Sequence, residues 1–181
     1  MSRKTAELTA FSYVILGLVG RGGASAHDIV RMMRRGRIHW TAAESHYYSE
    51  PKRLERLGYL ESTVQPGKTT DRRVYSLTPE GRQALLAWLP TPASLPRIQN
   101  EAALHLLSAD LLGDDGAIRD SLLAMREELD QVAVDLAASR AVEPAVPHRA
   151  RYLRLINDLH ERTVAMYRAW LDEVERELGD G

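Results

Sequence analysis

The sequence predicts a mainly α-helical fold with one small β-hairpin, organised as two domains. Apolar residues recur at the three- and four-residue spacing of helices along most of the chain, while two short β-prone runs flank a Pro66-Gly67 turn. Three prolines fall within the seven residues 90–96. Because each proline fixes its own φ and biases the preceding residue towards extended forms, this stretch predicts a semi-rigid linker. We therefore expect one domain over residues 1–90 and another over 97–181, joined by residues 91–96.

Composition restricts the classes of protein that the chain can belong to. Its 181 residues suffice for a sizeable core, and the absence of cysteine excludes disulfides and thiolate chemistry. No apolar run approaches the roughly 20 residues that span a bilayer, and the start of the chain does not resemble a signal peptide. We expect a cytoplasmic protein that does not enter a membrane.

Charge is distributed unevenly between the two expected domains. The net charge is −1, but residues 1–90 hold 14 basic and 8 acidic side chains, whereas residues 91–181 hold 10 and 17. A basic half joined to an acidic half is typical of a chain in which one part meets phosphates and the other meets protein. Chance segregation of charge is the alternative interpretation.

Two helices are predicted in the first 35 residues. Leu8 to Val19 is apolar on nearly all sides and is expected to be buried. The glycine-rich stretch 20–23 that ends it is interpreted as a turn, because it lacks the pattern of a phosphate-binding loop. Ser25 is expected to cap the second helix, Ala26 to Arg35, with Asp28 near its positive end.

The third predicted helix begins near Ala42 and runs to residue 57. Thr41 and Glu44 have the spacing of a capping box, and Gly58 stands where a left-handed cap is needed. Pro51 lies inside this helix, on the face that the apolar spacing turns inward. Since an internal proline removes a hydrogen bond and crowds the preceding turn, we expect the helix to bend there.

A β-hairpin and a fourth helix follow. Tyr59 to Gln65 and Val74 to Leu77 are β-prone, and the polar, mostly basic residues 66–73 between them are expected to form the turn. Thr78 and Pro79 predict the start of the next helix, because a threonine cap is followed by proline at the first helical position. This helix is expected to end near residue 89.

The order helix, hairpin, helix is the pattern of a winged helix-turn-helix domain, in which the helix before the hairpin enters the DNA major groove. The segment also resembles the DNA-binding domain of the PadR-like transcriptional regulators. The resemblance is carried by Tyr48, by Lys52-Arg53-Leu54-Glu55-Arg56-Leu57-Gly58-Tyr59-Leu60 and by Arg73-Val74-Tyr75-Ser76-Leu77-Thr78-Pro79-Glu80-Gly81. Pro51 departs from it, since the family usually has leucine there. The resemblance implies a homodimer that represses transcription by binding a palindromic operator in double-stranded DNA.

The DNA contacts are expected on the polar face of the third helix and on the hairpin. Cationic groups suit phosphates, and short polar groups near the start of the helix suit base edges. We expect phosphate contacts from Lys52, Arg53, Arg56, Lys68, Arg72 and Arg73, base contacts from Ser45, His46 and Ser49, and further contacts from Tyr48 and Thr69. For Tyr48, packing is the alternative role, and Arg72 is also a candidate for insertion into the minor groove.

Everything after the linker is predicted to be helical, over Ile98 to Leu112, Ala117 to Arg140 and Tyr152 to Leu178. The second of these carries a heptad seam, and the last has one apolar side, formed by Tyr152, Ile156, Leu159, Thr163, Met166, Trp170, Val174 and Leu178. Such helices need a facing helix, so we expect an intramolecular hairpin that also packs against a second copy. The expected dimerisation residues are Ile118, Leu122, Met125, Leu129, Val132, Ile156, Leu159, Met166 and Trp170.

A small aromatic or drug-like effector is also implied by the resemblance. The candidate effector-binding residues are His27, Trp40, Trp88, Tyr152 and Trp170, for which a place in the core is the alternative role. The competing function for the whole chain is a winged helix that contacts only protein, which would need no basic hairpin.

No enzyme is expected from this sequence. It has no cysteine nucleophile and none of the patterns of zinc proteases, α/β-hydrolases or dinucleotide-binding folds. Glu101 and His105 have the spacing of two metal ligands on a helix, but two are too few for a metal site. We therefore expect no catalytic residue, no metal and no cofactor.

Overall fold

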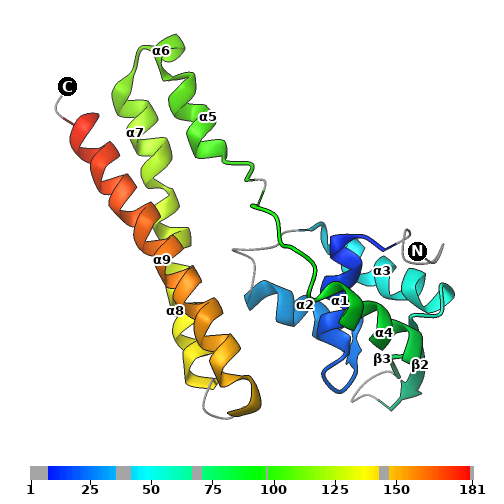
Figure 1. Cartoon of the computed structure of the whole chain (residues 1–181). Helices are drawn as coiled ribbons and strands as arrows, with labels where there is room; N and C mark the ends of the chain where they lie inside the picture. Colours follow the sequence, from blue (N-terminus) through cyan, green and yellow to red (C-terminus); the bar gives the residue numbers. More distant parts are fainter. Residues whose placement is uncertain (1–7, 36–41, 67–70, 97, 143–146, 180–181) are drawn as a thin grey trace. The chain divides into compact units, whose positions relative to one another are not determined.

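The structure is a computed structural model that describes residues 8–35, 42–66, 71–96, 98–142 and 147–179 (Figure 1). The chain divides into two compact units, residues 1–94 and 95–181, and the junction lies within the proline-rich stretch. The elements of the first unit are α1 (Ala10–Val19), β1 (Ala24–Ser25), α2 (Ala26–Arg35), α3 (Glu44–Arg56), β2 (Leu60–Gln65), β3 (Arg72–Leu77) and α4 (Pro79–Trp88). Those of the second are α5 (Glu101–Leu107), α6 (Ala109–Leu112), α7 (Asp115–Leu123), α8 (Met125–Val142) and α9 (Pro147–Glu177).

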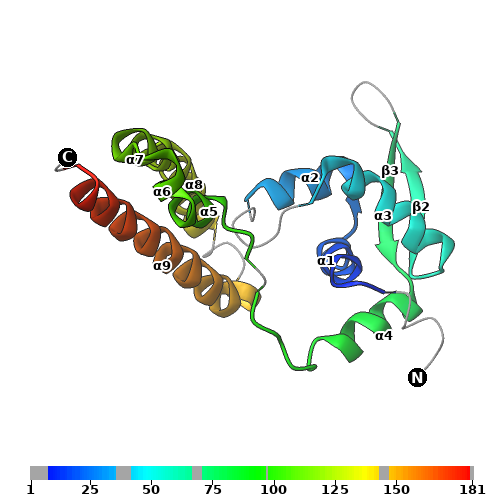
Figure 2. The same cartoon turned by 90° about the horizontal axis from the view of Figure 1, so that it is seen from above.

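Helix α1 is the centre of the first unit. Figure 2 views it end on, with α2, α3 and α4 around it, and it contacts all three as well as β3. Ile15 and Leu16 are fully buried, which confirms that the predicted apolar helix is a core helix. It begins two residues later than Leu8, because Thr9 and Ser12 form a capping box at its start.

The sheet of the first unit has three antiparallel strands in the order β1-β3-β2. Strand β1 was not predicted, since two residues are too few to show an alternating pattern. Strand β3 begins at Arg72, two residues before the predicted Val74, and pairs Arg72 with Gln65 and Arg73 with Val64. The placement of both arginines in the turn was therefore wrong, because strand pairing continues beyond the apolar residues.

Helix α3 begins at Glu44, two residues later than predicted. Its cap residue is Ala43, which makes no side-chain capping hydrogen bond, whereas Thr41 lies outside the described residues. The helix ends as predicted, with Gly58 in the left-handed region at a φ of 80°. The inward face is also confirmed, since Tyr47, Pro51 and Leu54 are buried.

Pro51 lies inside one unbroken helical span, Glu44–Arg56. Its ring is among the most buried side chains of the first unit, so it contributes to the core where leucine is usual in the resembling family. The expected bend of the helix around Pro51 stays a prediction.

A single threonine joins the end of α3 to the start of α4. The Thr78 hydroxyl donates a hydrogen bond to the Gly58 carbonyl at 2.7 Å and accepts one from the Gly81 N–H at 3.0 Å. Pro79 follows at the first helical position. The predicted helix start is confirmed, and the contact fixes the hairpin at its open end, where both strands meet the helices.

In the second unit, α7 and α8 run alongside α9 (Figures 1 and 2). The first predicted helix is shorter and broken. It begins at Glu101 after an Asn100 cap and is interrupted at Ser108 before it ends at Gly113. The second begins at Asp115 after an Asp114 cap and is interrupted at Ala124. Apolar periodicity carries no signal for these interruptions, because the spacing of the seam continues across them.

The heptad seam packs inside the unit, with Ile118, Leu122, Leu129 and Leu136 buried. The side of α9 that is buried in the unit was predicted wrongly. Its buried residues are Asn157, His160, Val164, Leu171 and Val174, of which only Val174 belongs to the predicted apolar side. Much of the predicted side is exposed, with fractions of 47–65% at Tyr152, Ile156, Leu159 and Met166. The helix is apolar on two sides, and the side with the larger residues is not the one that packs on α8.

Ion pairs connect α9 to α8. Arg126 contacts Asp172 at 2.8 Å and Glu175 at 2.9 Å, and Arg168 contacts Asp130 at 2.6 Å. Near the other end of α8, Arg140 pairs with Asp158 and Glu161. The pairs lie along the length of the antiparallel helices, so they favour a single register between them. Among the described residues, no helix combines the length and apolarity that crossing a bilayer requires.

Candidate nucleic-acid interface

Helix α3 presents a polar face to solvent. With Tyr47, Pro51 and Leu54 turned inward, helical geometry leaves the other side of the helix outside. Its exposed residues include six of the predicted DNA contacts, Ser45, His46, Tyr48, Ser49, Lys52 and Arg56. The face therefore carries hydroxyl, ring and cationic groups that can donate hydrogen bonds to phosphates and base edges.

An open hollow joins this face to strand β3. It has a volume of about 690 Å³ and is lined by Ser45, Tyr48, Ser49, Lys52, Glu55, Arg56 and Arg73. The structure thus brings Arg73 of the hairpin beside five predicted contacts of the helix. Figure 2 shows α3 next to β2 and β3, and α3 is in contact with β2.

Glu55 is the residue of the hollow that the sequence analysis did not select. Its carboxylate accepts a hydrogen bond from the Ser62 hydroxyl at 2.5 Å and another from Arg73 Nη1 at 3.2 Å. It thereby connects α3 to both long strands. The signal that could have found it is its place in the run from Lys52 to Leu60, as the carboxylate among the cations of that run.

Arg72 is paired with a different helix. Its Nη1 lies 3.6 Å from Oδ2 of Asp28, which also accepts hydrogen bonds from the Ser25 hydroxyl and N–H. The hydrogen bond from the Ser25 hydroxyl is the main cause that holds the pKa of Asp28 below its ordinary value; burial opposes it, and Arg31 and Arg72 reinforce it. Arg72 and Arg73 are each about half exposed, so both can still meet a partner from solvent.

Arg53 points to the core side of α3 rather than to its polar face. Its Nε and Nη2 donate to Glu50 at 2.8 Å and 2.7 Å, and Nη2 also lies 3.0 Å from the Ser12 hydroxyl of α1. Burial alone would raise the pKa of Glu50, but hydrogen bonds from Arg53 and Ser12 outweigh it and lower that pKa. The structure does not group Arg53 with the other predicted contacts.

Some predicted residues lie elsewhere. Lys68, Thr69 and Trp40 are outside the described residues. His46 is exposed next to Phe11, with ring centroids 6.3 Å apart. Of the effector candidates in the first unit, His27 is exposed on α2 and Trp88 stacks on Tyr13, with centroids 4.6 Å apart and planes 5° from parallel. In the second unit Tyr152 is exposed, and Trp170 meets Tyr167 edge to face at 6.4 Å.

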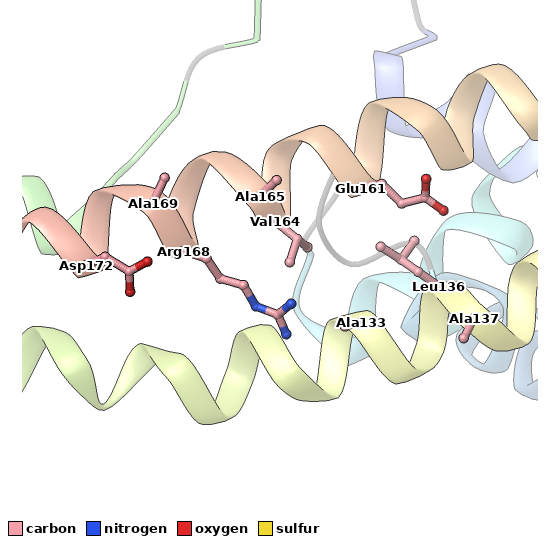
Figure 3. Close-up of a pocket in the computed structure, with 9 residues that line it drawn as sticks. All are labelled: Ala133, Leu136, Ala137, Glu161, Val164, Ala165, Arg168, Ala169 and Asp172. Atoms are coloured by element: carbon pink, nitrogen blue, oxygen red, sulfur yellow. The ribbon is translucent and has the colours of Figure 1, made fainter.

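A second hollow, of about 570 Å³, lies between α8 and α9 (Figure 3). Its lining residues are Ala133, Leu136, Ala137, Glu161, Val164, Ala165, Arg168, Ala169 and Asp172, none of which carries an aromatic ring. Figure 3 shows the guanidinium of Arg168 turned towards α8, where it pairs with Asp130. Short alanine side chains and the flanking ion pairs explain this hollow as a groove between packed helices.

A helical core, a helix with an exposed polar face and a two-stranded hairpin whose arginines lie beside that face define a winged helix-turn-helix protein. A family model described as the transcriptional regulator PadR-like family matches residues 15–87. The negative transcriptional regulator PadR of Bacillus subtilis is 26% identical over 179 residues, covering 92% of this chain and 96% of that protein.

Solved structures agree in fold. The crystal structure of Bacillus subtilis PadR in complex with operator DNA has a TM-score of 0.66 at 22% identity, over 92% of this chain and 98% of that one. A PadR-like transcriptional regulator from Bacillus cereus has a TM-score of 0.78 at 19% identity, with 99% of each chain covered. Residues 15–87 thus match the PadR-like family of transcriptional regulators, a non-enzymatic family of DNA-binding regulators, and the chain is similar over nearly its full length to one of its members.

Proposed function

We propose that the protein is a homodimeric repressor of the PadR type, which reads a palindromic operator and is released by a small aromatic effector. The observation that carries the DNA-reading part is the hollow between α3 and β3, where three cations, two serine hydroxyls and a phenol share one exposed surface. In this proposal residues 1–90 form the DNA-binding domain and residues 97–181 the dimerisation domain.

The residues of the hollow divide into two roles. Lys52, Arg56 and Arg73 neutralise phosphates, because they are exposed cations that surround the groove-facing surface. Ser45 and Ser49 contact base edges, since they are short and lie in the first half of the helix. We include His46, Tyr48, Arg72, Lys68 and Thr69 in the same interface, the last two from the sequence alone. The operator complex of the Bacillus subtilis relative supports a duplex as the partner.

Exposed apolar residues of the second unit support a dimer. Beyond the exposed row on α9, α5 and α6 expose Leu104, Leu107, Leu111 and Leu112. Exposed apolar residues in such number mark sites of protein association. A two-fold dimer would present two copies of α3 about one helical turn apart, roughly 34–36 Å, and so would read two inverted half-sites.

An aromatic effector is supported by a relative. A crystal structure of Bacillus subtilis PadR contains p-coumaric acid; that chain is 23% identical over 92% of this one, with a TM-score of 0.58. The candidates His27, Trp40, Trp88, Tyr152 and Trp170 offer aromatic rings and an imidazole for a planar acid. Titration with p-coumaric acid, followed by tryptophan fluorescence, should change the emission and weaken operator binding. An unchanged spectrum with unchanged DNA affinity would remove this acid from the proposal.

A gel-shift titration against the chain's own upstream DNA tests the DNA-reading part. Wild-type protein should bind with a steep salt dependence, and Lys52→Ala and Arg56→Ala should each lower the slope by about 0.9 log unit per log salt. Arg82→Ala is the matched control, because Arg82 is an exposed cation on α4 outside the hollow. Absence of a shift at any salt concentration would favour a winged helix that contacts only protein. A reporter gene under the same promoter, compared with and without the regulator, then decides between repression and activation.

A further inference from the structure

Glu55 places a negative charge inside a surface that is proposed to face DNA phosphates. It is the one carboxylate among the seven residues that line the hollow. Its side chain is 28% exposed, so its charge is felt in the hollow, and near phosphates it opposes binding. A neutral residue there would remove that penalty, so the contacts of the carboxylate have to explain its presence.

Those contacts connect three elements at one point. From α3, Glu55 accepts the Ser62 hydroxyl of β2 at 2.5 Å and Arg73 Nη1 of β3 at 3.2 Å. The distance between the recognition helix and the hairpin is thus fixed by a charged group that bridges them. Among the described residues, Glu55 is the one hydrogen-bond partner of the Arg73 guanidinium. The other N–H groups of Arg73 are therefore available to solvent or to a ligand.

Arg72, the neighbour of Arg73, holds the same end of β3 from the other face of the sheet. Successive side chains of a strand point to opposite faces, and accordingly Arg72 pairs with Asp28 of α2 while Arg73 pairs with Glu55 of α3. The first two residues of β3 are therefore held by carboxylates from two different helices. These two ion pairs favour one orientation of the hairpin relative to α3.

We propose that Glu55 is a positioning residue for operator recognition: it holds the Arg73 guanidinium over the hollow, so that α3 and Arg73 contact one stretch of the duplex together. This inference rests on the proposed DNA-reading function of the hollow. Glu55 itself does not contact DNA. Its negative charge weakens binding to any duplex, but its contacts fix the geometry on which preference for the operator depends.

The test is a comparison of two affinities by fluorescence anisotropy, for an operator duplex from the upstream region and for a scrambled duplex of the same composition. Glu55→Gln keeps the shape of the side chain and removes its charge. We expect the operator preference to fall about tenfold, because a displaced Arg73 no longer fixes the register in which α3 meets the base edges, while affinity for the scrambled duplex is unchanged or higher. Arg73→Gln should lose the same preference, and the double variant should lose no more than either single one.

Glu61→Gln is the matched control, because Glu61 is an exposed carboxylate on β2 of the same hairpin. It should tighten binding to both duplexes equally and leave the preference unchanged. If Glu55→Gln behaves in the same way, or if its effect and that of Arg73→Gln simply add, Glu55 has no positioning role and the inference is overturned.

Ser62→Ala keeps the test decisive if Glu55→Gln does not fold. It removes one donor to Glu55 and leaves every charge in place, so the operator preference should fall about threefold; an unchanged preference overturns the inference. Wild-type protein that binds neither duplex would instead overturn the proposed function itself.

Discussion

Arg53 and Glu50 form a charged pair on the inner flank of α3, with Arg53 Nη2 2.7 Å from Glu50 Oε1 and 3.0 Å from the Ser12 hydroxyl. The pair connects the proposed recognition helix to the core helix α1. Since the Glu50 side chain is only 12% exposed, its carboxylate depends on these donors in place of water. Arg53 therefore belongs to the support of α3, and its neighbour Lys52 to the exposed face.

Arg53→Ala and Lys52→Ala should separate these two roles. Loss of Arg53 leaves a largely buried carboxylate with fewer donors, so unfolding should become easier by about 1–3 kcal/mol, with an unchanged salt slope of DNA binding. Loss of Lys52 should leave the melting temperature unchanged and reduce the salt slope. Thermal unfolding and binding at several salt concentrations measure both. An Arg53→Ala variant that melts normally but loses salt slope would contradict this assignment.

The same pair predicts how stability depends on pH. The folded-state pKa of Glu50 is lower than its ordinary value of 4.5, so below about pH 5 the unfolded chain binds more protons than the folded one. The contribution of the pair is therefore fully present near neutral pH and is lost as pH falls through the folded-state pKa. Glu50→Gln should unfold more easily at pH 7 and show a flatter decline between pH 5 and pH 3 in chemical denaturation. Parallel curves for the two proteins would rule out this role.

Gly81 is expected to tolerate no side chain. A Cβ atom there would lie 2.0 Å from the Tyr59 carbonyl oxygen, and this close approach lets Thr78 bind both Gly58 and Gly81. Gly81→Ala should destabilise the first unit by about 3 kcal/mol or more. Gly17→Ala, with no heavy atom within 4 Å of the added Cβ, is the matched control and should stabilise helix α1 by roughly 0.5–1 kcal/mol. Equal melting temperatures for the two variants would contradict the prediction.

Asn157 is a polar residue in the core of the second unit. Its Oδ1 accepts a hydrogen bond from Ser139 at 3.0 Å, whereas its buried Nδ2 has no hydrogen-bond partner among the described residues. Asn157→Leu should therefore raise the free energy of unfolding by about 1 kcal/mol, because it removes an unpaired buried donor from an apolar seam. Asn157→Ala should lower it, since a cavity replaces the amide. Urea denaturation of both variants gives the comparison, and a leucine variant less stable than wild type would contradict this account.

Charge on the exposed row of α9 should prevent pairing of two copies. The double variant Leu159→Glu with Met166→Glu places carboxylates where the proposed interface requires apolar contact, so sedimentation should show monomers where wild type shows dimers. Leu86→Glu with Leu89→Glu makes the same chemical change at exposed leucines on α4 and at its C-cap, and it should leave the dimer intact. Dimers that persist in the first variant would place the interface elsewhere.

Local physics made several elements predictable from the sequence. The left-handed cap at Gly58, the cap at Thr78 and the inward face of α3 depend on neighbours within a few residues, and all three are confirmed. The polar face of α3 followed from the same periodicity. The proposed PadR-like resemblance rested on these residues too, and the family match bears it out.

Contacts between elements distant in sequence were not predictable in the same way. Arg53 and Lys52 are adjacent cations, and only the position of Ser12 on α1 decides which of them is held by the core. Likewise, the sequence gives no reason to separate Glu55 from other surface charges, because its contacts with Ser62 and Arg73 form only in the fold. On α9 the large apolar side chains predicted the packed side wrongly, since smaller residues and the amide of Asn157 face α8 instead.

The two-sided character of α9 links folding to assembly. One side of the helix completes the core of its own unit, and the other is a row of apolar side chains at 47–65% exposure. If that row is covered only when two copies meet, part of the stability of each folded chain depends on protein concentration. The melting temperature should then rise with protein concentration, and in dilute solution an unpaired chain would be a short-lived species.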